Sequence, residues 1–69
     1  MSENNYEKKV LEILKDTDEK STSEIASIIS RDFYFAQRLL EDLKGKNLIE
    51  KIEVGNFTYW KIKENGKEI

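Results

Sequence analysis

The first apolar residues of the chain recur every three to four positions, the spacing that places side chains on one face of a helix. The members of this stripe are Tyr6, Val10, Ile13 and Leu14. They predict a helix over residues 5–16. After a polar connection, Ser21 and Glu24 stand three positions apart, as in a capping box, in which each side chain accepts a hydrogen bond from the other residue's backbone N–H. This signal predicts a second, short helix over residues 23–30.

A third helix is predicted over residues 32–46. Asp32 is a favourable N-cap, because its carboxylate can accept a hydrogen bond from a free N–H of the first turn. The apolar side chains at helical spacing that we expect on its inward face are Phe33, Ala36, Leu40 and Leu43. Gly45 or Asn47 ends the helix, since both residue types tolerate a positive φ.

The pattern then changes from helical spacing to alternation. Ile52 and Val54 alternate with Glu53, and Gly55-Asn56 has the composition of a two-residue type II′ hairpin loop. The return strand covers residues 57–63. An isolated hairpin is not stable in water, so its apolar face should pack on the helices.

Alternation on the return strand separates two faces. Trp60 and Ile62 share the face that we expect in the core, and the residues of the opposite face are Tyr59, Lys61 and Lys63. The predicted fold is therefore α+β: a three-helix bundle followed by a two-stranded β-hairpin over residues 49–63, all within one domain of residues 1–69.

Composition excludes most catalytic chemistry. The 69 residues include neither His nor Cys, so an imidazole base, a thiolate nucleophile, a disulfide and the usual zinc ligands are absent. Apolar runs are too short to span a membrane, and no signal peptide is evident. Glycine-rich phosphate loops are also missing. We expect a cytoplasmic, soluble, non-enzymatic module with no catalytic residue, no cofactor and no metal.

Charge is distributed unevenly along the chain, although the net charge is only −2. Residues 1–30 carry four Lys against seven Asp and Glu, whereas residues 31–63 carry seven Lys and Arg against five Asp and Glu. The second half is therefore the place to look for an anionic partner.

These elements together resemble the winged helix-turn-helix domains of small bacterial, archaeal and viral transcription regulators. The similarity runs from about Tyr6 to Ile69. Its carriers are residues 23–29, the Ala36/Leu40/Leu43 stripe leading into Asn47-Leu48-Ile49, and the aromatic ending of residues 59–69. Lys63 replaces the usual Thr, and the chain stops where many relatives begin a further helix used for dimerisation.

The resemblance implies that residues 32–46 form a recognition helix that enters the major groove of double-stranded DNA. At about 100° per residue, Arg38 lies opposite the apolar stripe. The candidate DNA contacts of this region are Arg31, Tyr34, Phe35, Gln37 and Arg38. A solvated surface is the alternative for Arg38, which can pair with Glu41 or Asp42. Phe35 is alternatively part of the core or of a subunit contact.

Two further groups are candidate phosphate contacts. The first is the hairpin, or wing, with Lys51, Asn56, Phe57, Lys61 and Lys63. Pairing of Lys61 and Lys63 with Glu53 and Glu50 across the hairpin is the alternative. The second group is Ser21, Thr22 and Ser23, at the start of a helix. Helix capping alone is sufficient to explain these three residues.

The leading hypothesis is a sequence-specific DNA-binding protein, a transcription regulator. We expect it to act as a homodimer, because one module with so few basic residues should bind weakly. Candidate dimer surfaces are Tyr6, the first helix and the residues near Ile69. The alternative hypothesis is a protein–protein interaction module that docks through Tyr34 and Phe35.

Overall fold

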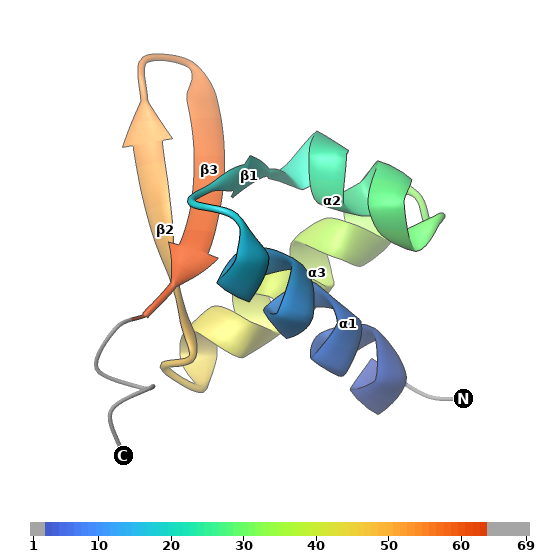
Figure 1. Cartoon of the computed structure of the whole chain (residues 1–69). Coiled ribbons are helices and arrows are strands. Elements are labelled where there is room, and N and C mark those ends of the chain that lie inside the picture. Colours follow the sequence, from blue (N-terminus) through green and yellow to red (C-terminus); the bar gives the residue numbers. More distant parts are fainter. Residues whose placement is uncertain (1–2, 64–69) are drawn as a thin grey trace.

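Three helices pack on a small antiparallel sheet (Figure 1). The computed structural model describes residues 3–63. The elements are α1 (Glu3–Asp16), β1 (Lys20–Ser21), α2 (Thr22–Ile29), α3 (Phe33–Gly45), β2 (Ile49–Val54) and β3 (Phe57–Ile62). The predicted α+β class is confirmed, and the helix bounds differ from those predicted by no more than two residues. The end of the sequence motif, with Ile69, lies outside the described residues.

The helix ends form as the capping residues indicate. The Ser21 side chain accepts a hydrogen bond from the Glu24 N–H (3.2 Å), and the Glu24 carboxylate accepts one from the Ser21 N–H (2.9 Å), which completes the capping box of α2. Asp32 caps α3 by accepting from the Phe35 N–H. Asn47 has a φ of 65° just after α3, which is the positive φ expected where that helix ends.

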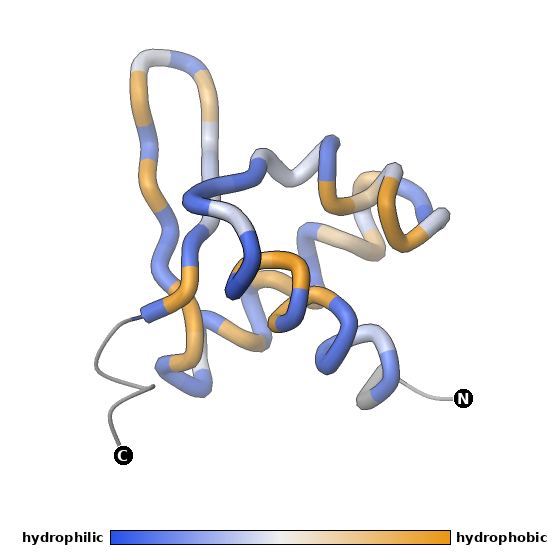
Figure 2. The backbone as a smooth tube through the Cα atoms, in the orientation of Figure 1, coloured by the Kyte–Doolittle hydropathy of each residue, from blue (hydrophilic) through white to orange (hydrophobic). Residues whose placement is uncertain are grey.

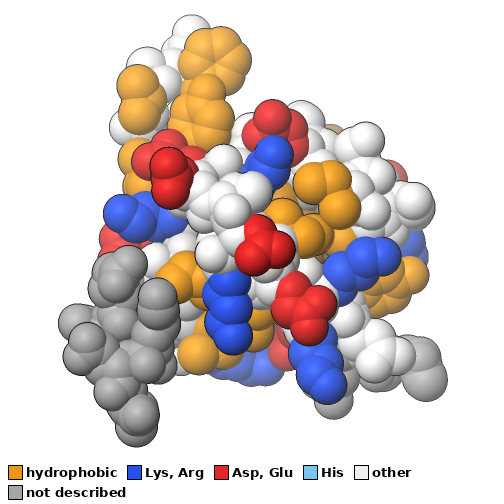
Figure 3. All heavy atoms as spheres, viewed as in Figure 1, with side chains coloured by type: hydrophobic (Ala, Val, Ile, Leu, Met, Phe, Trp, Pro, Cys, Tyr) orange, Lys and Arg blue, Asp and Glu red, His pale blue; other side chains and the backbone are white. Residues whose placement is uncertain are grey.

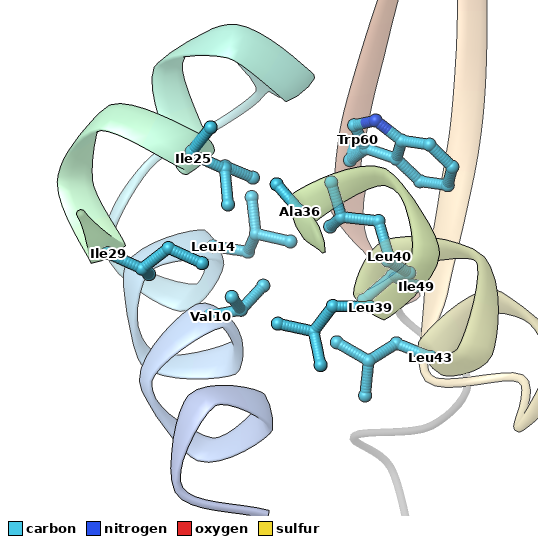
Figure 4. Packing of buried hydrophobic residues seen from close by; sticks show 11 residues of the cluster. Val10, Leu14, Ile25, Ile29, Ala36, Leu39, Leu40, Leu43, Ile49 and Trp60 are labelled. Atoms are coloured by element: carbon cyan, nitrogen blue, oxygen red, sulfur yellow. The ribbon is translucent and has the colours of Figure 1, made fainter. Parts of the chain in front are cut away.

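The core lies between the helices and the inner face of the sheet (Figure 4). Its buried apolar side chains are Val10, Leu14, Ile25, Ala26, Ile29, Ala36, Leu39, Leu40, Leu43, Ile49 and Trp60. Trp60 was expected in the core and is 1% exposed. Its indole N–H donates a 2.8 Å hydrogen bond to the hydroxyl of Thr22, which is itself buried. This bond connects the middle of β3 to the start of α2.

The predicted inward face of α3 was wrong at one position. Phe33 is 45% exposed, whereas Leu39, which the predicted stripe left out, is buried. Viewed down the helix axis, Phe33 lies about 60° from Ala36 in one direction and Leu39 about 60° from Ala36 in the other. The buried face of α3 is therefore rotated toward Leu39 and away from Phe33.

The sheet contains a strand that the sequence did not indicate. Lys20 and Ser21 form β1, within the segment predicted as a polar connection and a helix cap, and β1 pairs antiparallel with β3. Two residues are too few to show alternation, so only the tertiary pairing reveals this strand. The sheet order is β1-β3-β2, which leaves β2 at one edge.

The hairpin has the predicted loop and a well-defined register. Gly55 has a φ of 62°, as a type II′ loop requires at its first position. The register places Val54 opposite Phe57 and Ile52 opposite Tyr59. Cross-strand partners share a face, so these four side chains lie on the face away from Trp60. Figure 2 shows the resulting apolar positions along the upper part of the hairpin.

Candidate functional site

The first two turns of α3 present exposed side chains of mixed character. Tyr34 is 78% exposed, and Gln37 and Arg38 are exposed as well, as predicted. The rings of Phe33 and Tyr34 lie edge to face, with centroids 5.9 Å apart. Phe33 therefore belongs to this surface rather than to the core. This α3 surface combines aromatic rings with amide and guanidinium donors.

Arg31 lies in the turn before α3 and is bound to two other elements. Its guanidinium donates a 3.2 Å hydrogen bond to the hydroxyl of Tyr6 on α1 and lies 3.8 Å from the centroid of the Phe35 ring. The rings of Tyr6 and Phe35 contact each other edge to face, with centroids 5.1 Å apart. Phe35 is half-buried in this cluster and packs against the core. The arrangement joins α1 to the start of α3 and agrees with the core alternative for Phe35.

The acidic side of α3 is partly neutralised by the wing. Lys51 Nζ lies 3.3 Å from a carboxylate oxygen of Glu41 and 3.8 Å from one of Glu53. The same ammonium lies 5.6 Å from the centroid of the Trp60 ring. Lys51 is thus held at the inner face of the hairpin, and Glu41 is held toward the wing. Asp42 is exposed one position further along α3.

The other wing candidates lie in three different surroundings. Asn56 and Phe57 are exposed at the tip. Lys61 stands directly opposite Glu50 in the register, whereas Glu53 stands opposite Thr58. Glu50 is therefore the acidic residue of the hairpin that is placed to neutralise Lys61. Lys63 Nζ donates a 3.2 Å hydrogen bond to the side-chain oxygen of Asn47 instead of contacting an acidic residue of the hairpin.

The serine and threonine residues at the start of α2 serve the fold. Ser21 forms the capping box, and Thr22 is 6% exposed with its hydroxyl bonded to Trp60. Ser23 is exposed. The pKa of Glu24 is lowered, chiefly because its carboxylate accepts the hydrogen bond from the Ser21 N–H. Desolvation acts in the opposite direction and raises the pKa, while Lys20 and the Ser21 side chain make smaller contributions that lower it. Capping accounts for Ser21 and Glu24.

Two features of this surface were missed by the sequence pattern. One is Phe33, whose helical spacing matched the core. The other is the outer apolar face of the hairpin, where Ile52 and Val54 lie. The two-residue loop was the available signal for the second feature, because it places Val54 opposite Phe57 and so sets the face of every later pair.

A shallow, polar hollow of about 350 Å³ lies between the end of α1 and β3. Its lining residues are Leu14, Lys15, Thr17, Asp18, Glu19, Lys61 and Ile62. Within residues 3–63, no group of three or more acidic side chains is placed to hold a metal ion. None of the helices in that range is long and apolar enough to cross a membrane.

Solved structures provide the clearest comparison. A Zα domain of PKZ from Carassius auratus, determined in complex with Z-DNA, has a TM-score of 0.80 and 21% identity, and the match covers 90% of this chain and 98% of that one. The oxidised form of MarR from E. coli has a TM-score of 0.79 and 23% identity over 88% of this chain. ZitR from Lactococcus lactis has a TM-score of 0.80 and 17% identity over 91% of this chain.

The match with MarR covers 45% of the MarR chain, and the match with ZitR covers 49% of the ZitR chain. No protein-family model and no curated protein sequence matches the chain. The likeness therefore lies in the arrangement of the elements. The three helices and the hairpin have the winged-helix fold.

Proposed function

We propose that this chain is a sequence-specific double-stranded DNA-binding protein and a transcription regulator, with α3 in the major groove and the wing on the DNA backbone. One observation carries the proposal. The N-terminal half of α3 exposes Tyr34, Gln37 and Arg38, while Glu41, the acidic residue that follows them, is paired with Lys51 toward the wing. The fold it shares with a domain solved in complex with Z-DNA supports the DNA-binding part of the proposal.

The polar groups of this surface match those that DNA offers. In the major groove, an arginine fork fits the O6 and N7 acceptors of guanine, and a glutamine amide fits N6 and N7 of adenine. We assign these two roles to Arg38 and Gln37. Exposed Phe33 and Tyr34 supply apolar surface for a thymine methyl group.

Phosphate contacts complete the proposed interface. Lys61 and the exposed wing-tip residue Asn56 are the wing groups that we assign to the backbone, with exposed Ser23 at the start of α2. Thr22 is left out because its hydroxyl is buried against Trp60. We give Arg31 a positioning role, since it fixes the start of α3 against Tyr6.

The interface is small, so we expect binding as a homodimer, which doubles the number of contacts. We propose no catalytic activity for the chain. The surface formed by α3, the wing and the start of α2 is the part of the chain to which we assign DNA as the ligand.

The test is selection from random-sequence duplex DNA, followed by sequencing and titration of the enriched site at several salt concentrations. Arg38→Ala should weaken binding to that site by about 5- to 150-fold, which corresponds to about 1–3 kcal/mol for one bidentate base contact. Lys9→Ala, which removes an exposed cation from α1, is the matched control and should bind like the wild type. Lack of retention of any duplex at about 50 mM salt, where phosphate contacts are strongest, refutes the proposal.

A protein-binding role is favoured by one observation, the exposed apolar side chains Phe33 and Tyr34 together with Ile28 on α2. Phe35 contributes less to such a surface, because it is half-buried against Tyr6. Salt separates the two functions, since phosphate contacts give a steep loss of affinity with salt and an apolar contact does not.

A further inference from the structure

Within residues 3–63, the main-chain groups along the outer edge of β2 have no partner strand. The sheet order places β2 outermost, and Figure 1 shows no described element beyond it. The Lys63 N–H donates to the Leu48 carbonyl (3.1 Å), and the ladder continues from this pair along the hairpin. Antiparallel pairs alternate between bonded and non-bonded, so every second residue of β2 points its N–H and C=O away from β3. Those residues are Ile49, Lys51 and Glu53.

The outer face of the same hairpin is apolar. We call Ile52, Val54, Phe57 and Tyr59 the apolar wing face. Val54 is 58% exposed and Phe57 is 65% exposed, and the rings of Phe57 and Tyr59 lie 6.4 Å apart. Figure 3 shows these hydrophobic side chains gathered on the upper part of the wing. An apolar face beside a free edge is the combination that favours pairing with another strand.

We propose that a second copy of this chain pairs with β2 edge to edge, antiparallel about a two-fold axis, to form a continuous six-stranded sheet. In the proposed register, Ile52 stands opposite the partner's Ile52. The main-chain groups of Lys51 and Glu53, which point outward, then meet the partner's Glu53 and Lys51 and form four hydrogen bonds. The two apolar wing faces become one band across the dimer.

Charge selects this register over its neighbours. A two-fold axis perpendicular to the sheet pairs residues whose side chains lie on the same face. Moving this axis by one residue along β2 therefore shifts the partner of every residue by two positions. Centring the axis on Lys51 or on Glu53 would place like charges directly opposite each other, which is destabilising. Centring it on Ile52 instead pairs each Lys51 with the partner's Glu53. The occupant is therefore a second copy, because the same strand supplies both complementary halves.

This inference deepens the homodimer of the proposed function by naming its surface. Tyr6, which the sequence suggested for a dimer contact, is instead half-buried against Phe35 and bonded to Arg31. The experiment below contains no DNA, so its outcome is independent of DNA binding.

The test is sedimentation equilibrium of the whole chain, over about 10 μM to 1 mM, a range that covers weak association. The wild type should approach twice the monomer mass of 8.1 kDa. Glu53→Pro removes an N–H that points away from β3, so the hairpin keeps its own ladder while the edge loses two of the four intermolecular bonds. We expect at least about tenfold weaker dimerisation. Glu53→Ala, which keeps the N–H, is the matched control and should weaken it less.

The fluorescence of buried Trp60 reports whether each variant is folded. If Glu53→Pro does not fold, Glu53→Lys provides the reading, because it places a lysine opposite the partner's Lys51. That variant should dimerise weakly at low salt and better at high salt, where screening reduces the repulsion. A wild type that stays monomeric at about 1 mM overturns the proposal. The proposal is also overturned if the wild type forms a dimer that is not weakened by Glu53→Pro or, where that variant does not fold, by Glu53→Lys.

Discussion

Replacing Thr22 by valine tests the connection between the wing and the helices. Valine has nearly the shape of threonine but lacks the hydroxyl that accepts the 2.8 Å hydrogen bond from the Trp60 indole. The side chain of Trp60 is 1% exposed and Thr22 is 6% exposed, so water cannot replace the lost acceptor without opening the core. The variant therefore leaves a buried N–H donor without a partner.

The expected loss of stability is about 1–3 kcal/mol, the cost of leaving one buried polar group unsatisfied. A chain of this length has a total unfolding free energy of about 3–10 kcal/mol, so the loss is a large fraction of it. The melting temperature should fall by about 4–8 °C for each kcal/mol. Thr22→Ser, which keeps the hydroxyl and removes one methyl group, should cost about 1 kcal/mol.

Urea unfolding followed by far-UV circular dichroism measures these values, and the only tryptophan of the chain supplies an independent fluorescence signal for the Thr22 variants. A double-mutant cycle with Trp60→Phe isolates the pair, because the indole N–H and the hydroxyl are then removed singly and together. The reasoning would be refuted if the free energy of unfolding of Thr22→Val lay within about 0.3 kcal/mol of the wild-type value and the cycle showed no coupling energy between Thr22 and Trp60.

Two further predictions concern stability. Leu39→Ala should lower the free energy of unfolding by about 2–5 kcal/mol because it empties a buried site. Phe33→Ala should lower it by less than about 1 kcal/mol, since half-exposed Phe33 gains little from burial. Equal losses for the two variants in urea unfolding would show that Phe33 belongs to the core. The lowered pKa of Glu24 means that its carboxylate stabilises the fold above its ordinary pKa of 4.5 and that this contribution is lost as the pH falls through the lowered folded value. Glu24→Gln should therefore reduce the acid dependence of stability in that range, and an unchanged pH profile would contradict the assignment.

The sequence identified the elements because each carries strong local signals. The capping box at Ser21 and Glu24, the N-cap Asp32 and the Gly55-Asn56 loop all act over a few residues, and all have the expected geometry. Trp60 was placed correctly because its burial follows from alternation within one strand.

What the sequence did not show depends on contacts between distant segments. β1 exists only because Lys20 and Ser21 pair with β3, about forty residues away in the chain. The α3 stripe was misplaced because spacing alone allows both Phe33 and Leu39 to face inward. The position of Arg31 is similar, since the Tyr6 hydroxyl that it contacts belongs to α1. These placements need the packing of the whole domain.

The position of Trp60 along β3 means that the part of the hairpin between Trp60 and the loop is anchored to the helices at one end only. The strand pairs nearer the loop, such as Val54 with Phe57, lie beyond the last side chain of β3 that is buried in the core. Opening those pairs costs little, because few buried contacts are lost, whereas opening the strand at Trp60 also breaks its bond to α2. The tip can therefore open with less loss of buried contacts than the part of the hairpin at Trp60. A hinge of this kind lets the tip follow a curved or grooved surface without disturbing the helices.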